Sequence, residues 1–215
     1  IILGALSFMI SADKKKQRNA FVMFSILCSS ISVWLLALNA PEDSLVLLNF
    51  TDNLSFVLKL DGAGKIFSCL SATLWPLTAL YAFEYMSHEK NLPMFYAFFT
   101  MSFGATMGIA MASNILTMYL FYELLTLFTI PLVMHGLTKK HNQAARKYMN
   151  YSIGGAAFAF AGVAFLIVND ANDFVFGGHI TSPEDPTIAL ILFVFAFLGF
   201  GVKAAVFPLH SWLPT

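Results

Sequence analysis

Charged side chains are scarce in this sequence. Asp, Glu, Lys and Arg make up 11% of the 215 residues, whereas hydrophobic residues make up 58%. A typical soluble domain carries about 25% charged residues. A soluble fold of this length would have too few polar side chains to cover its surface. The composition therefore excludes a soluble globular domain and predicts a membrane protein.

An excess of charge of either sign is also missing, since 12 Lys and Arg balance 12 Asp and Glu. This balance excludes a nucleic-acid-binding surface. The two cysteines, Cys28 and Cys69, lie in separate apolar runs, which excludes a CxxC pair and a disulfide framework; we interpret both as small hydrophobic residues. The five His residues lack metal-binding spacing. We expect no metal and no cofactor.

Long uncharged runs are abundant. A bilayer core of about 30 Å takes roughly 20 apolar residues per helix, and the runs predict seven spans: 1–10, 20–40, 66–83, two between 92 and 138, 148–169 and 186–215. The first run reads as the tail of a span, so we expect a fragment of a longer polypeptide. Ser113 and Asn114 divide the fourth span from the fifth. The predicted fold is all-α, a polytopic transmembrane helix bundle.

The loop charges are sorted by side. Nine of the 12 Lys and Arg follow the first, third and fifth spans. Basic loops stay in the cytoplasm, so we expect these odd-numbered loops to be cytoplasmic. The nine residues are Lys14, Lys15, Lys16, Arg18, Lys90, Lys139, Lys140, Arg146 and Lys147.

Glu123 lies within a predicted span and does not belong to any of these loops. Counting from Asn114 at about 1.5 Å per residue places it roughly 13 Å deep, near the bilayer midplane. An ionisable residue there costs on the order of 2.5–3.5 kcal/mol and by default marks an ion pathway. The alternative is a structural ion pair, or a protonated Glu that bonds a neighbouring helix. Thr126 shares its face, and Pro131 predicts a kink just beyond.

Lys203 is the second remaining charge. Pro208 clashes with the carbonyl of Ala204 and predicts a helix break within one turn of the Lys. Broken membrane helices are tolerated where they line a cavity, and they recur at ion sites. The alternative is a Lys that extends to the membrane interface. His210 would share its face on a continuous helix and could exchange protons, although an interfacial His is equally compatible with the spacing.

Three segments resemble the antiporter-like subunits shared by respiratory complex I, Mrp-type cation/proton antiporters and membrane-bound hydrogenases. They are the aromatic–Glu–Leu segment at 121–127, the Ala-rich segment at 144–149, and the segment at 203–214, which is similar to the family's broken seventh helix. The segment at 121–127 leans towards the Mrp D-like branch. One departure is at Asp61–Gly64, where the family usually continues into a more apolar segment.

The resemblance implies about 14 helices in inverted repeats. Residues 1–91 would hold the first three helices, and 92–215 the opening part of the proton-channel repeat with helices four to seven. Glu123 and Lys203 would form a Glu–Lys pair whose separation and approach switch proton affinity. Lys147 would lie near the cytoplasmic mouth, and His210 on the hydrated axis.

The resemblance also implies one component of a hetero-oligomeric complex in a bacterial, archaeal or organellar inner membrane. It would move protons, with Na⁺ exchange left open, and have no redox or hydrolytic site of its own. The alternative is a non-conducting structural component of such a complex. Whether redox chemistry or an ion gradient drives the complex is not decided by these residues.

Overall fold

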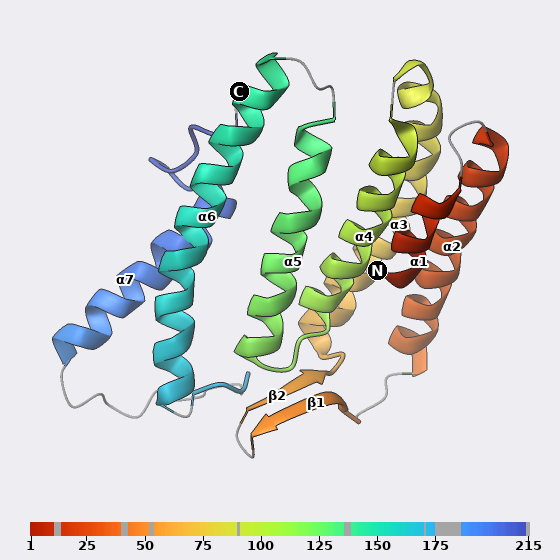
Figure 1. The fold of residues 1–215 in the computed structure, drawn as a ribbon. Coiled ribbons are helices and arrows are strands. Elements are labelled where there is room, and N and C mark those ends of the chain that lie inside the picture. The colour runs from red at the N-terminus through yellow and green to blue at the C-terminus, as the bar shows by residue number, and fades with distance from the viewer. Residues whose placement is uncertain are drawn as a thin grey trace.

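The protein is a bundle of long helices with a small hairpin at one end (Figure 1). The computed structural model describes residues 1–10, 14–39, 43–51, 54–89, 91–135, 139–169, 171–174 and 186–213. The helices are α1 (Ile2–Leu6), α2 (Lys15–Asn39), α3 (Gly62–Tyr85), α4 (Leu92–Ala110), α5 (Ile115–Val133), α6 (Lys139–Val168) and α7 (Pro186–Lys203). Two 3₁₀ turns, η1 (Ser7–Met9) and η2 (Met86–His88), and two strands, β1 (Leu45–Thr51) and β2 (Leu54–Leu58), complete the elements.

Six of the described helices, α2 to α7, are long and apolar enough to cross a membrane. Each coincides with one of the predicted runs, and α1 with η1 occupies the run at 1–10. The prediction of a polytopic transmembrane helix bundle is confirmed. The predicted break between the fourth and fifth spans is confirmed as well, because Asn114 is the N-cap of α5 and accepts a hydrogen bond from the Thr117 N–H at 2.8 Å.

The hairpin of β1 and β2 was not predicted. Its strands pair antiparallel, and it covers the turn between α4 and α5. The Asn114 side chain donates to the Ser55 carbonyl at 2.8 Å, and the Val57 N–H donates to the Thr117 hydroxyl at 3.0 Å. Asn114 and Thr117 are both buried. The same two polar side chains therefore begin α5 and fasten the hairpin to it.

The departure at Asp61 also has a local structural role. Asp61 is the N-cap of α3, and its carboxylate accepts from the Gly64 N–H at 2.6 Å. A Cβ at Gly64 would run into the Ala110 carbonyl of α4. The Asp and the Gly therefore start α3 in close contact with the end of α4.

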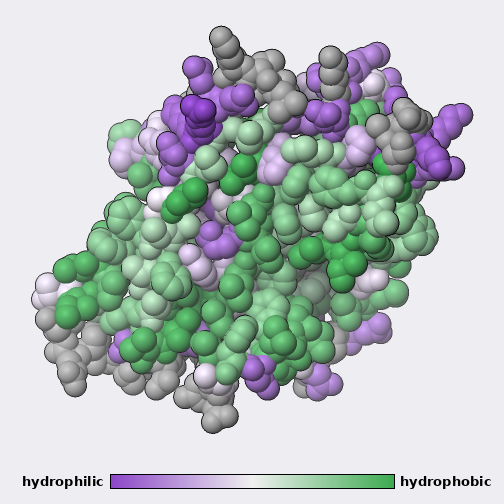
Figure 2. Space-filling model, in the orientation of Figure 1, coloured by the Kyte–Doolittle hydropathy of each residue, from purple (hydrophilic) through white to green (hydrophobic). Residues whose placement is uncertain are grey.

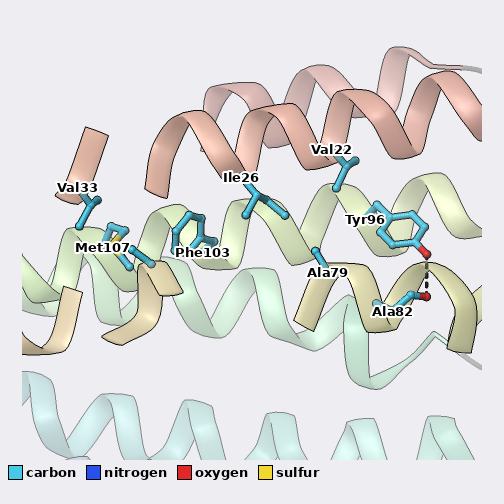
Figure 3. Packing of buried hydrophobic residues seen from close by; sticks show 9 residues of the cluster. Val22, Ile26, Val33, Ala79, Ala82, Tyr96, Phe103 and Met107 are labelled. Carbon is cyan, nitrogen blue, oxygen red and sulfur yellow. Dashed lines mark hydrogen bonds between the residues drawn. The ribbon is translucent and has the colours of Figure 1, made fainter. Parts of the chain in front are cut away.

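A cluster of buried hydrophobic residues lies between α2, α3 and α4 (Figure 3). Small residues on α3, including Ala79, let the larger side chains of α2 and α4 approach. Tyr96 is buried there, and its hydroxyl donates to the Ala82 carbonyl at 3.0 Å. Trp75 stacks on Phe103 with ring centroids 5.2 Å apart. Because α4 packs on both α3 and α5, it links this core to the site described below.

The outer surface of the bundle is apolar. Figure 2 shows a broad hydrophobic face with hydrophilic residues gathered mainly at one end. Large hydrophobic side chains stand exposed on the helices, for example Leu74 of α3 at 51% and Phe193 of α7 at 67%. Such a surface is stable only in lipid or against other apolar surfaces, so the chain is an integral membrane protein. The start of α2 and the α3–α4 and α5–α6 connections lie at the same end of the bundle (Figure 1). The compartment that this end faces stays a prediction. The division of the chain into residues 1–91 and 92–215 also stays a prediction.

Candidate functional site

Helix α7 ends at Lys203, five residues before Pro208. The Ala205 N–H donates to the Val202 carbonyl at 3.1 Å, and the Val206 N–H donates to the Gly201 carbonyl at 3.0 Å. These two bonds form a Schellman motif, in which Ala205 has the left-handed conformation with φ 52°. An L-residue in that conformation costs roughly 1–2 kcal/mol. The predicted break is therefore present, but the chain leaves the helix at Ala205, before the Pro that was expected to cause it.

The Lys203 ammonium reaches across to one turn of α5. It donates to the Tyr122 carbonyl at 2.8 Å and to the Thr126 hydroxyl. It also lies over the face of the Tyr122 ring, 3.4 Å from the centroid. Lys203 is partly buried and Thr126 is buried. The side chain is thus held against the middle of α5, and its depth in the membrane stays a prediction.

Glu123 lies beside these partners on α5. It is partly buried, and its Oε1 atom has no hydrogen-bond partner among the residues that the structure describes. The ammonium is bonded to the residue before Glu123 and to Thr126, three positions after it. The Lys203 ammonium is therefore bonded to the turn of α5 that carries Glu123.

Close contact between α6 and α7 positions Lys203. A Cβ at Gly155 of α6 would lie 2.9 Å from Val202, and one at Gly199 of α7 would lie 2.7 Å from the Cα atom of Ala159. Small residues are the usual way for membrane helices to approach this closely. The surface around Gly155 is therefore a helix contact, and it supports the last turn of α7.

Aromatic and hydroxyl side chains surround the site, and the sequence pattern had not singled them out. The Thr129 hydroxyl is 2.7 Å from the Tyr148 hydroxyl, which joins α5 to α6. The Trp212 ring lies against Tyr148, with centroids 5.3 Å apart, and its N–H donates to the Val202 carbonyl at 2.9 Å. The segment after α7 therefore folds back beside Lys203. The sequence offered one indication that Tyr122 and Thr129 belong to the site, because each lies within two turns of Glu123 on α5.

The two other predicted residues lie apart from these contacts. Lys147 is half-buried near the start of α6, beside Tyr148 in the chain. His210 is exposed and stacks on Phe207, with ring centroids 5.5 Å apart. Because α7 ends at Lys203, His210 does not share a helix face with it, and the interpretation based on a continuous helix does not apply.

These features define a class: a polytopic membrane-helix bundle in which a lysine of one helix is bonded to the turn of another helix that carries a glutamate. Residues 112–215 match the family described as NADH:quinone oxidoreductase/Mrp antiporter, TM. This part of the chain belongs to that family of antiporter-like membrane subunits.

Curated relatives agree with this assignment. The chain is 30% identical over 165 residues to a probable K(+)/H(+) antiporter subunit (type A/B) of Rhizobium meliloti (strain 1021), covering 75% of this chain and 16% of that protein. It is 25% identical over 164 residues to a Na(+)/H(+) antiporter subunit (type A1) of Staphylococcus aureus (strain JH9), covering 75% and 20%. The chain thus spans a fifth or less of the length of these relatives. Both relatives carry the letter A in their names, and the lean towards the D-like branch stays a prediction.

Two solved structures share the fold. A chain of the membrane-bound sulfane sulfur reductase, an archaeal respiratory membrane complex, matches with a TM-score of 0.82 at 17% identity, over 100% of this chain and 46% of that one. A chain of the Mrp complex from Dietzia sp. DQ12-45-1b matches with a TM-score of 0.79 at 17% identity, over 99% and 24%. At this identity the matches establish the architecture alone.

Proposed function

We propose that this chain is part of a membrane subunit that translocates ions, and that it moves protons through Glu123 and Lys203. The observation that carries the proposal is the Lys203 ammonium, held inside the bundle by the Tyr122 carbonyl and the Thr126 hydroxyl on the turn of α5 that carries Glu123. Two ionisable residues in lipid are costly to keep. A function that needs both of them explains their presence.

The proposed step is electrostatic. When the ammonium contacts the carboxylate of Glu123, each group stabilises the charge of the other, and Lys203 holds its proton. When the ammonium moves away, the attraction weakens and low-dielectric surroundings favour its neutral form, so the proton passes to the next group. The two groups then titrate as a coupled pair. In this proposal, an ammonium bonded to Tyr122 and Thr126 represents the separated state.

The ion and the setting follow from the relatives as proposals. The two curated relatives carry K(+)/H(+) and Na(+)/H(+) in their names, and the ion common to both is the proton. We propose the proton as the ion of this site, other membrane subunits as its partners, and the cytoplasm as the compartment facing the basic end. Lys147 and His210 are proposed to line the proton path on either side of Lys203.

Transport measurements on matched variants test this proposal. Glu123→Gln and Lys203→Ala are made in the full-length protein, within its complex, in membrane vesicles with a fluorescent proton indicator. The controls are Glu84→Gln and Lys59→Ala, which change the same residue types at exposed positions. We expect both site variants to lose proton translocation and both controls to keep it. Unchanged translocation in the assembled site variants would show that the protein is structural or that protons take another path.

A further inference from the structure

Tyr122 of α5 contacts the last turn of α7 with its carbonyl, its ring and its hydroxyl. An aromatic residue that faced only lipid would make none of these contacts. The carbonyl of Tyr122 accepts from the Lys203 ammonium, and its ring face lies under the same ammonium. Its hydroxyl donates to the Gly199 carbonyl at 3.4 Å, and its ring meets the edge of Phe200 with centroids 5.2 Å apart. The ring is thus fixed by the turn of α7 that ends in Lys203.

We propose that Tyr122 is a positioning residue for Lys203, and that its ring face, with the Thr126 hydroxyl, forms a second binding position for the ammonium. The first position is the carboxylate of Glu123, the next residue along α5. The ammonium would pass between them by rotation of the lysine side chain, while α5 and α7 keep their places. This inference rests on the proposed function, because it names what holds the ammonium when the Glu–Lys pair is open.

The physical reason is the quadrupole of the aromatic ring. A cation over a ring face is attracted by its negative π surface, and the attraction strengthens when water is excluded. A second position of this kind lowers the free energy needed to move the Lys203 ammonium away from the Glu123 carboxylate, so the Glu–Lys pair can open repeatedly. Without the ring, the ammonium keeps the Tyr122 carbonyl and the Thr126 hydroxyl but loses the π contact. The equilibrium then shifts towards Glu123 by about tenfold or more.

The test uses Tyr122→Phe and Tyr122→Leu in the full-length protein in lipid. Phe keeps the ring and loses only the long hydroxyl contact to Gly199, whereas Leu removes the ring and keeps an apolar side chain. Solid-state NMR of lysine labelled with ¹⁵N reports the ammonium directly, and Lys203→Arg assigns its signal by loss. Protons over a ring face are shifted upfield by the ring current, so the signal reports whether the ammonium occupies the ring face.

We expect the upfield ammonium signal in the wild type and in Tyr122→Phe, and its loss in Tyr122→Leu. Proton translocation should be about tenfold slower in Tyr122→Leu than in Tyr122→Phe. Absence of the upfield signal in the wild type would overturn the proposal whether or not Leu folds. Equal translocation by folded Leu and Phe variants would overturn it too. Failure of the proposed function is separate, because it shows as unchanged translocation in Lys203→Ala.

Discussion

Gly199→Ala is expected to separate α6 from α7 and to disturb the site. A Cβ at Gly199 would collide with the backbone N of Ala159 and lie 2.6 Å from the Gly155 carbonyl oxygen. Both obstacles are backbone atoms, so no side-chain rotation can relieve them. Reaching ordinary contact at 3.4 Å with the Gly155 oxygen requires a movement of about 0.8 Å, the difference between 3.4 and 2.6 Å, and the closer Ala159 N requires a larger one. Overpacking of this kind costs about 1–3 kcal/mol.

The functional effect should be larger than the loss of stability. The Gly199 carbonyl accepts from the Tyr122 hydroxyl, and Lys203 follows one turn later on α7. A displacement near 1 Å at a reacting group can cost on the order of 10²-fold in rate. We therefore expect proton translocation to fall by at least tenfold while the protein remains folded.

Gly154→Ala is the matched control. Gly154 is exposed on the same helix as Gly155, and a Cβ there would meet nothing within 4 Å. Thermal unfolding in lipid nanodiscs and translocation in vesicles are measured for both variants. The control should unfold at or slightly above the wild-type temperature, because Ala favours a helix over Gly by about 0.5–1 kcal/mol. If Gly199→Ala behaves like its control in both assays, close contact between α6 and α7 does not position Lys203.

Two further variants test the hydrogen bonds that join α5 to the hairpin and to α6. Asn114→Ala removes the bonds to the Thr117 N–H and the Ser55 carbonyl, so the free energy of unfolding should fall by about 2 kcal/mol; an unchanged denaturation midpoint would contradict the proposed link between hairpin and helix. Tyr148→Phe removes the 2.7 Å bond to Thr129 and should cost about 1 kcal/mol by the same measurement. A stability equal to the wild type would mean that this bond contributes nothing to the contact of α5 with α6.

The helices were predictable because a membrane-spanning helix depends on a single feature of the sequence. A membrane span needs a long uncharged run, and the runs coincide with α2 to α7. The polar pair Ser113–Asn114 predicted the turn because a buried Asn between two apolar helices needs hydrogen-bond partners, which the N-cap supplies. Likewise, Glu123 and Lys203 could be singled out because so few charges remained after the loops were counted.

The hairpin and the ammonium contacts could not be predicted in the same way. Strand β1 is almost uniformly apolar, with no alternation to distinguish it from part of a helix, and its residues are all exposed. The exit of α7 at Ala205 depends on a left-handed conformation that Ala rarely adopts, whereas Pro208 gave the visible signal. Tyr122 looked like one aromatic among many, since 15% of the chain is aromatic. Its role depends on the end of α7, which lies 81 positions away in the chain.

A double-mutant cycle on Glu123 and Lys203 tests the central claim most directly. Proton translocation is measured for Glu123→Gln, Lys203→Ala and the double variant, with assembly of each confirmed. Groups that act as one unit are strongly non-additive, because removing either already removes the function of both. The account predicts that the double variant is no slower than the worse single variant. Rate losses that multiply in the double variant, or translocation retained by either single variant, would contradict it.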